Sequence, residues 1–377
     1  MKENKKIQKV VIGMSGGVDS SVAAILLKKQ GYQVIGVHMK YWSEKDEVDI
    51  CDNGIVNNDP SRANACCSLD SLEDARRVCA KLDIPLYVVD FKEKFKERIV
   101  NLFIEELKSG FTPNACVVCN RDVKFGLLLD YALSIGAEFV ATGHYAQIFQ
   151  TINKELIHYG IKNAIDEKKD QSYFLSLLSQ EQLSHIILPL GSLTKDKVRE
   201  IALENGLVNS KRRDSQDLCF VSKDYKSFVQ KYANPKPGNI ILKTGEIIGQ
   251  HEGLVFYTLG QRKGLNTKIN TPLYVYDKDF EHNDLIVDIA FEKDTSSIIL
   301  KDFNSLNNQN NESYENLDQL DFVGRYQGSR IQIKSIEISS DNRLNIRFFE
   351  NQTKFANGQY GAIYRKDILM GAGKIIS

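Results

Sequence analysis

The sequence has no excess of either charge and little that resembles a membrane segment. Lysine plus arginine and aspartate plus glutamate both number 49, so the whole molecule exerts no long-range attraction on RNA or on an anionic membrane. Any contact with nucleic acid must therefore come from local patches. The basic residues 1–6 are followed by only a short apolar run before Ser15, which predicts neither a signal peptide nor a membrane span.

Cysteine is also used sparingly. The seven cysteines are an odd number in a chain of 377 residues without an export signal, which is typical of a reducing compartment where thiols bind metals or take part in chemistry. We expect a cytoplasmic enzyme with no membrane partner. The length predicts a large core divided among two or three domains.

Two common nucleotide motifs are missing from the first glycine loop, which follows the apolar run at residues 10–12. The loop has no Gly-Lys-Ser/Thr lysine, which excludes a Walker loop, and no third glycine with a later acidic residue, which excludes a dinucleotide fingerprint. However, Gly16 and Gly17 can take positive φ and let a phosphate approach backbone N–H groups. The helix that follows adds its positive end. The loop therefore predicts a phosphate site.

The form Ser15-Gly-Gly-Val-Asp-Ser20 resembles the PP-loop of ATP pyrophosphatases. That resemblance implies cleavage of ATP between the α and β phosphates, with the loop holding pyrophosphate while adenylate passes to an acceptor oxygen. Other PP-loop enzymes are ligases or amidotransferases that adenylate a small molecule, and this remains an alternative function. A second alternative is a non-catalytic, nucleotide-gated RNA-binding protein or sulfur carrier.

Strand and helix patterns alternate through the first half of the chain. Strands are predicted at residues 32–39, 85–91 and 138–145, and helices at residues 20–31, 71–82, 92–108 and 124–135. This order predicts an α/β fold with a doubly wound parallel sheet and ligands outside the carboxyl ends of the strands.

The composition changes after Asp214. Prolines and glycines interrupt short β-prone runs, which predicts a small linking domain. Residues 331–338 and 344–349 then alternate apolar and polar side chains, as half-buried antiparallel strands do, and a β-barrel is the natural closure. We expect an ATP-binding catalytic domain at 1–213, a linking domain at 214–285 and a C-terminal antiparallel β-barrel at 286–377.

Two cysteine motifs and several shorter ones extend the resemblance. Cys116 and Cys119 lie in Thr-Pro-Asn-Ala-Cys-Val-Val-Cys-Asn at residues 112–120, and Cys219 lies in Asp-Ser-Gln-Asp-Leu-Cys-Phe-Val at residues 214–221. Further motifs occur at residues 141–145, 169–174, 260–264 and 324–326. In this order, they resemble the tRNA-specific 2-thiouridylase (MnmA) family over nearly the whole chain.

The resemblance implies a two-stage reaction on the wobble uridine of the tRNA anticodon stem-loop. ATP with Mg²⁺ adenylates the uridine O2, because a carbonyl oxygen leaves poorly and AMP leaves well. Sulfur then replaces that oxygen at C2, giving 2-thiouridine, AMP and pyrophosphate. Cys219 would carry the sulfur as a persulfide received from a relay protein. Cys119 would free the terminal sulfur, and a Cys119–Cys219 disulfide is one product.

The resemblance also implies binding residues. At the phosphates of ATP they are Gly13, Met14, Ser15, Gly16, Gly17, Val18, Asp19 and Ser20, with Met39 and Gly143 at the adenine. For Asp19, a role in binding Mg²⁺ and a role in capping the helix are compatible. The implied tRNA contacts are Asn114, Ala115, Cys116, His144, Lys169, Asp170, Gln171, Arg325, Tyr326 and Gln359. Residues 211–213 are equally a phosphate contact or a solvated turn.

One position departs from the family pattern. Cys116 stands where many members have aspartate, so the usual proton donor and acceptor is replaced by a thiol. The CxxC spacing leaves open a second route, in which Cys116, Cys119 and Cys219 hold three irons of a [4Fe–4S] cluster whose fourth iron binds sulfide. Cys51, Cys66 and Cys67 flank a polar excursion and are either a zinc clip or unligated loop thiols. No other metal site is expected.

Overall fold

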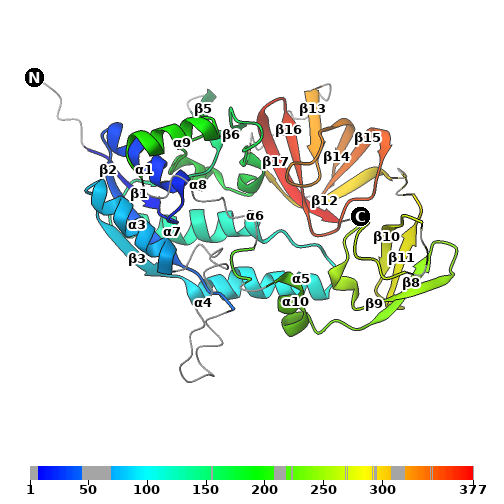
Figure 1. Ribbon diagram of the computed structural model, residues 1–377. Coiled ribbons are helices and arrows are strands. Elements are labelled where there is room, and N and C mark those ends of the chain that lie inside the picture. The colour runs from blue at the N-terminus through cyan, green and yellow to red at the C-terminus, as the bar shows by residue number, and fades with distance from the viewer. Residues whose placement is uncertain are drawn as a thin grey trace, which may run out of the picture.

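The computed structural model describes residues 7–44, 69–153, 156–207, 218–221, 224–267, 269, 271–290, 292, 295–306, 319–339, 341 and 343–376. It has three parts: a parallel sheet with helices on both faces, a small four-stranded sheet and a β-barrel (Figure 1). Cys51, Cys66, Cys67 and residues 211–213 lie outside the described residues, as do residues 214–217 of the Cys219 motif. No helix in the described part of the chain is both long enough and apolar enough to span a membrane.

The first part is built on five parallel strands. They are β1 (Lys9–Gly13), β2 (Gln33–Lys40), β3 (Leu86–Asp90), β4 (Phe139–Ala141) and β7 (Ile186–Ile187), in the order β3-β2-β1-β4-β7. Strand β1 is central, and Val10, Val11 and Ile12 are fully buried. Such an uninterrupted apolar run is typical of a parallel strand covered on both faces.

The helices form two layers that divide the side chains of β1 between them. Val10 and Ile12 pack in the core with α1 (Val18–Lys29), α3 (Leu69–Lys81) and α9 (Lys195–Glu204). Val11 packs in the core on the opposite face of the sheet, against a second layer of helices. The sheet is therefore doubly wound, as predicted. The second layer contains α4 (Lys92–Phe95), η2 (Lys96–Asn101), α5 (Leu102–Lys108), α6 (Ala115–Cys119), η3 (Asn120–Leu127) and α7 (Leu128–Ser134).

The order of the strands reverses at β1. The chain adds β2 and β3 on one side of β1, then returns to place β4 and β7 on the other side. Ile12 pairs in register with Ala141, so the loops that follow β1 and β4 leave the same edge of the sheet side by side. In open parallel sheets this reversal of strand order is where ligands bind.

The linking part is a small sheet with its own apolar core. Its strands are β8 (Gly238–Leu242), β9 (Ile247–His251), β10 (Tyr274–Asp279) and β11 (Asp284–Asp288), in the order β10-β11-β8-β9. Ile240, Val275 and Leu285 are fully buried at its centre. Helix α10 (Tyr225–Ala233) precedes this sheet, and the short turn η5 (Leu254–Phe256) follows β9.

The third part is a closed barrel of six antiparallel strands. They are β12 (Thr295–Ser305), β13 (Leu320–Val323), β14 (Ile331–Ile338), β15 (Leu344–Gln352), β16 (Tyr360–Arg365) and β17 (Ile368–Ile376). Closure comes from β12, which pairs with both β15 and β17. Leu300, Phe322 and Ile346 fill the centre. The predicted barrel is confirmed.

A hairpin from the first half of the chain extends the barrel sheet. Its strands are β5 (Ala146–Asn153) and β6 (Leu156–Asn163), and β6 pairs with β17 at Ile368 and Leu369 (Figure 1). The turns η4 (Ser172–Leu175) and α8 (Gln180–Ser184) then lead back to the parallel sheet. The hairpin and the barrel therefore form one continuous sheet.

Candidate active site

The glycine loop after β1 has the geometry of an anion site. Gly16 has a φ of +74°, and a Cβ there would lie 2.3 Å from the backbone oxygen of Ser71, so a larger residue does not fit. Gly17 is the N-cap of α1 and brings no side-chain acceptor to the first N–H groups of the helix. The hydroxyls of Ser15 and Ser20 lie 3.2 Å apart across the loop. A phosphate is the natural partner for such a helix end.

The two residues predicted at the adenine lie beside this loop. A Cβ on Gly143 would come within 2.8 Å of the backbone of Asp19 and Ser20, so the loop after β4 packs directly on the start of α1. A Cβ on Gly13 would lie 3.2 Å from Cε of Met39. The structure therefore brings the predicted nucleotide residues together at the carboxyl edge of the sheet.

A buried lysine that the sequence analysis missed meets Asp19 at this edge. Lys195 is the first residue of α9, and its Nζ lies 2.8 Å from both carboxylate oxygens of Asp19. The side chain of Lys195 is 6% exposed, and that of Asp19 is 28% exposed. The hydroxyl of Tyr145 also donates to Asp19 Oδ1 at 2.7 Å. No spacing rule connects residue 195 with residue 19, so no sequence signal could have found this contact.

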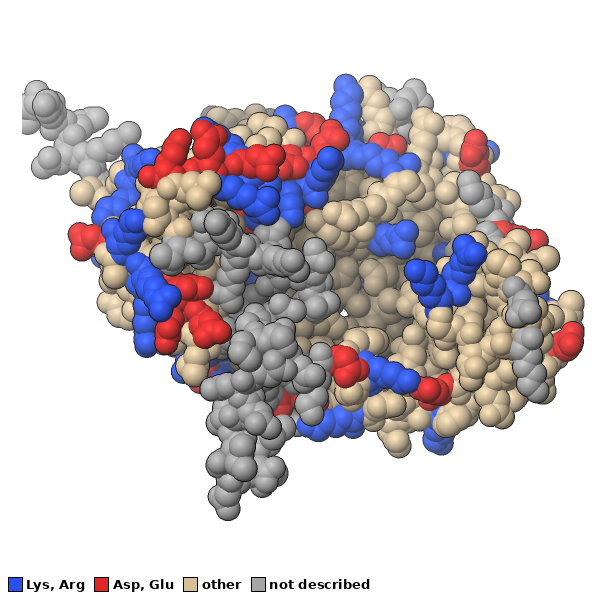
Figure 2. Space-filling model, in the orientation of Figure 1, with Lys and Arg blue, Asp and Glu red and all other residues tan. Residues whose placement is uncertain are grey.

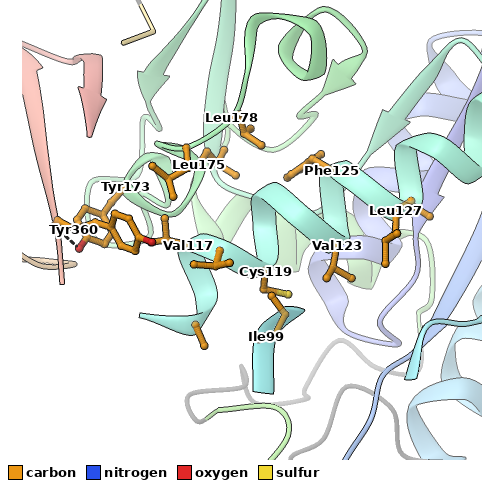
Figure 3. Packing of buried hydrophobic residues seen from close by; sticks show 14 of the residues in the cluster. Ile99, Val117, Cys119, Val123, Phe125, Leu127, Tyr173, Leu175, Leu178 and Tyr360 are labelled. Atoms are coloured by element: carbon orange, nitrogen blue, oxygen red, sulfur yellow. Dashed lines mark hydrogen bonds between the residues drawn. The ribbon is translucent and has the colours of Figure 1, made fainter. Parts of the chain in front are cut away.

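Cys119 and Cys116 lie on one short helix in different environments. Asn114 is the N-cap of α6, and its side chain accepts a hydrogen bond from the backbone N–H of Val117 at 3.4 Å. Cys119 is 7% exposed and packs in the large apolar cluster, where Figure 3 shows it beside Ile99. Cys116 is exposed. A helix of this kind positions one thiol inside the protein and leaves the other in contact with solvent.

Cys219 is held by its neighbour Phe220. The Phe220 ring is 1% exposed and lies 5.4 Å from the ring of Phe103 and 5.5 Å from that of Phe228, between centroids. Cys219 is partly buried and packs against the same large cluster that contains Cys119. The two predicted catalytic thiols, about a hundred positions apart in sequence, thus contact the same apolar cluster.

Three of the predicted tRNA residues, Asn114, Tyr326 and Gln359, take part in two contacts between the first part of the fold and the barrel. The ring of Tyr326 lies 4.3 Å from that of Phe174, which follows the motif at residues 169–171. At the second contact, Asn114 Nδ2 donates to Gln359 Oε1 at 3.3 Å, and Gln359 Nε2 donates to the backbone oxygen of Thr112 at 3.1 Å. Figure 2 shows one face of the molecule hollowed at its centre, with Lys, Arg, Asp and Glu side chains along the edges of the hollow.

Comparison with known proteins agrees with this arrangement. A family model described as "tRNA methyl transferase HUP domain" matches residues 8–223, one described as "tRNA methyl transferase PRC-barrel domain" matches residues 226–288, and one described as "Aminomethyltransferase beta-barrel domain" matches residues 295–375. The "tRNA-specific 2-thiouridylase MnmA" of Clostridium botulinum (strain Eklund 17B / Type B) is 40% identical over 371 residues, covering 98% of each chain. The chain belongs to the tRNA-specific 2-thiouridylase family.

Other relatives of the same name show similar agreement. The proteins of Lachnoclostridium phytofermentans and Clostridioides difficile are each 40% identical, and the matches cover 98% of this chain and 100% and 98% of those proteins. The similarity to this 2-thiouridylase family therefore extends through all three parts of the fold, which confirms the family resemblance inferred from the motifs.

Two side chains that the 2-thiouridylase resemblance places at tRNA are turned toward the protein. Asp170 accepts hydrogen bonds from Ala164 N at 2.8 Å and Ser172 Oγ at 2.7 Å, and its burial raises its pKa. Gln171 Oε1 accepts from the backbone N–H of Tyr145 at 3.0 Å. Through Tyr145 this motif is connected to Asp19 and the glycine loop. In this structure both side chains accept hydrogen bonds from neighbouring segments of the protein.

His144, also placed at tRNA by the resemblance, is buried and uncharged. Its Nδ1 lies 2.7 Å from the Thr142 hydroxyl, and its ring lies 5.7 Å from that of Phe125. Burial is the main cause that holds the pKa of His144 well below its ordinary value, and the charge of Lys124 lowers it further. Folding therefore favours the neutral form of the imidazole.

This burial predicts a loss of stability in acid. Below about pH 6.5 the unfolded histidine binds a proton that the folded one does not, so the free energy of unfolding should fall by up to about 1.4 kcal/mol per pH unit for this residue. Urea unfolding between about pH 7.5 and pH 5 measures the slope, and His144→Gln should reduce it. His38 and His251, whose pKa values are also lowered by burial, contribute to the slope that remains. An unchanged slope in the variant would contradict the prediction.

Proposed function

We propose that this protein forms 2-thiouridine at the wobble position of tRNA, using ATP to activate uridine O2. The observation that carries the proposal is the full-length similarity to tRNA-specific 2-thiouridylases, 40% identical over 98% of both chains. The glycine loop at the reversal of strand order supports it, because adenylation needs a site for the phosphates of ATP. We propose that the protein acts in the cytoplasm, on the anticodon stem-loop of tRNA.

In the first stage uridine O2 attacks the α-phosphate of ATP. The new O–P bond forms as the bond to the β-phosphate breaks, and pyrophosphate leaves with the electron pair. Residues 13–20 hold the phosphates, and Met39 and Gly143 flank the adenine. The O2 oxygen, now part of an adenylate, can leave C2 as AMP. Mg²⁺ would supply charge neutralisation on the phosphates when bound.

In the second stage a persulfide on Cys219 supplies the sulfur. The Cys119 thiolate attacks Cys219 Sγ, a Cys119–Cys219 disulfide forms, and the terminal sulfur leaves as hydrosulfide with the electron pair. Hydrosulfide adds to C2 and AMP departs. A thiol reductant must then reduce the disulfide, and a persulfide relay protein must reload Cys219.

We favour this route over a [4Fe–4S] cluster on Cys116, Cys119 and Cys219. Across the described residues no group of three or more His, Cys, Asp or Glu side chains is arranged to hold a metal ion, so these three thiols do not fit a cluster in this structure. Anaerobic purification with iron and sulfide analysis separates the routes. Full thiolation activity in protein without iron would support the persulfide route. Activity that rises and falls with the iron content would overturn that route.

We propose three domains with different roles, at residues 1–213, 214–285 and 286–377. The first domain binds ATP and carries the thiols, and the second connects it to the barrel. The barrel contributes Arg325, Tyr326 and Gln359 to the RNA surface. The family models, which end and begin near residues 223, 226, 288 and 295, support a similar division.

Arg325 offers a test of the RNA surface. It is exposed in a turn closed by a hydrogen bond from Gly328 N to Arg325 O at 2.9 Å. Arg325→Ala should weaken tRNA binding roughly five-fold and make the slope of log K against log salt less steep by about 0.7 to 1. ATP binding without tRNA should not change. The control is Arg343→Ala. Arg343 directly precedes β15 of the barrel, and its side chain pairs with Asp341. Equal affinity for both variants and the wild type would remove Arg325 from the interface.

The reaction itself is tested by mass spectrometry of nucleosides. Unmodified tRNA is incubated with the protein, ATP and a persulfide source, and 2-thiouridine at the wobble position is the expected product. AMP and pyrophosphate should appear only when tRNA is present. Pyrophosphate release that needs a small carboxylate or amide instead of tRNA would indicate a PP-loop ligase. Binding of tRNA without pyrophosphate release would indicate an RNA-binding carrier.

A further inference from the structure

The glycine loop needs a source of positive charge that its own sequence does not provide. The phosphates of ATP carry several negative charges, whereas the loop offers only backbone N–H groups and the partial charge of a helix end. It has no lysine of its own between Gly13 and Ser21. A cation fixed beside the first turn of α1 would complete the site.

Lys195 occupies that place. Its Nζ lies 2.8 Å from Asp19 Oδ1 and 2.8 Å from Asp19 Oδ2, in the first turn of α1. Its position is fixed at the backbone as well, because Lys195 N donates to Asp166 Oδ2 at 2.9 Å. The Tyr145 ring lies 5.7 Å from Nζ and supports the cation from another side. A nearly buried ammonium that is positioned in this way loses little entropy when it binds an anion.

The same contacts leave Asp19 poorly suited to bind Mg²⁺. Mg²⁺ requires carboxylate oxygens at about 2.0–2.1 Å in octahedral geometry. Both oxygens of Asp19 already contact the Lys195 ammonium, and Oδ1 also accepts from Tyr145. A metal on Asp19 would have to displace a cation from a site where that cation is nearly buried. Asp19 therefore fits the task of holding a lysine better than that of holding a metal.

We propose that Lys195 is the cation that binds the β- and γ-phosphates of ATP and the pyrophosphate product, and that Asp19 positions Lys195 instead of ligating Mg²⁺. An ammonium group has three donors and can bridge a carboxylate and a phosphate oxygen. Lys195 then does for this loop what the motif lysine does in a Walker loop, although it comes from a helix far along the chain. The inference rests on the proposed use of ATP.

Inorganic pyrophosphate is the probe that tests this assignment directly. Its binding is measured by calorimetry, with and without Mg²⁺, and as product inhibition of AMP formation on tRNA. Lys195→Met should weaken pyrophosphate binding at least about ten-fold and lower kcat for AMP formation by about 10²- to 10³-fold, the usual loss when one fixed electrostatic donor is removed. Inhibition by AMP, which lacks the β- and γ-phosphates, should change little. Lys195→Arg should retain part of the binding.

Lys197→Met is the matched control. Lys197 lies two residues further along the same helix, and its side chain is 48% exposed and pairs with Glu200. The variant removes one positive charge from the same helix without touching Asp19, so pyrophosphate binding and AMP formation should remain as in the wild type. An equal loss in both variants would indicate a general charge effect and would contradict a specific role for Lys195.

A double variant separates binding from folding. Lys195→Met leaves Asp19 without its cation, so this protein could lose stability for that reason alone. Asp19→Asn combined with Lys195→Met removes both charges and should recover much of the thermal stability, yet pyrophosphate binding should stay lost. Recovery of pyrophosphate binding along with stability would show that Lys195 is only a structural partner.

Asp19→Asn alone decides the role of the carboxylate. If Asp19 positions Lys195, the variant should weaken pyrophosphate binding both with and without Mg²⁺ and leave the Mg²⁺ concentration for half-maximal activity within about two-fold. A ten-fold rise in that concentration, with metal-free pyrophosphate binding intact, would make Asp19 a metal ligand and overturn the proposal. Failure of the wild-type protein to bind ATP or pyrophosphate would instead reject the proposed function, so the two failures are distinguishable.

Discussion

Cys219→Ser should abolish 2-thiouridine formation, with a loss of at least about 10³-fold, while the protein still cleaves ATP on tRNA. A serine hydroxyl cannot carry a persulfide, so the second stage has no sulfur to transfer, and removal of a covalent nucleophile produces losses of this size. The first stage does not use the thiol. The expected result is therefore AMP and pyrophosphate without 2-thiouridine, measured in the same reaction by nucleotide chromatography and nucleoside mass spectrometry.

Three further cysteine variants make this result specific. Cys119→Ser should also stop thiolation, but Cys219 should retain one extra sulfur that intact mass measurement detects. Cys79→Ala is the matched control, because burial raises the pKa of Cys79 to about 12 and keeps it from acting as a thiolate. Cys116→Ser should stay active by the persulfide route. Loss of activity in Cys116→Ser together with retained activity in Cys219→Ser would contradict the assigned roles.

Phe220→Ala should destabilise the protein by about 3 to 5 kcal/mol, the usual range for a fully buried aromatic ring. The ring packs against Phe95, Phe103 and Phe228, with centroids between 5.4 and 6.1 Å from its own. Its loss leaves a cavity in that aromatic group and frees the segment that carries Cys219. Urea unfolding measures the stability, and thiolation should decline more than AMP formation at temperatures where the variant remains folded.

The control for Phe220 is another phenylalanine with a different environment. Phe349 is 60% exposed on the barrel strand β15, so Phe349→Ala should change the free energy of unfolding by less than about 0.5 kcal/mol. If thiolation and AMP formation fell in parallel in Phe220→Ala, the ring would stabilise the whole domain instead of positioning Cys219.

Much of the parallel sheet could be predicted because its signals are local. The apolar run Val10, Val11 and Ile12 followed by glycines identifies a buried strand and a loop within a dozen residues. Alternating side chains likewise identify β14 and β15 of the barrel. Gly16 and Gly17, together with the helix that follows them, indicated the phosphate loop, and Gly16 does have the positive φ that this reasoning requires.

The parts that escaped prediction depend on contacts between distant residues. The ion pair between Lys195 and Asp19 joins two helices, and the sequence pattern of neither helix indicates that the two are in contact. The hairpin β5–β6 could not be assigned to the barrel sheet, because strand partners are set by tertiary packing and only a few residues of β6 meet β17. Asn114 and Gln359 also meet only once the barrel has docked.

Strand β17 gives the molecule a defined order of assembly. It pairs with β16, β12 and β6, and the ribosome makes it after all three. Until it emerges, the barrel has an open seam and the hairpin of the catalytic domain has an unpaired edge, which invites association with other chains. Closure of the barrel and its attachment to the hairpin β5–β6 thus coincide, so a nascent chain cannot complete the proposed RNA surface before β17 has paired.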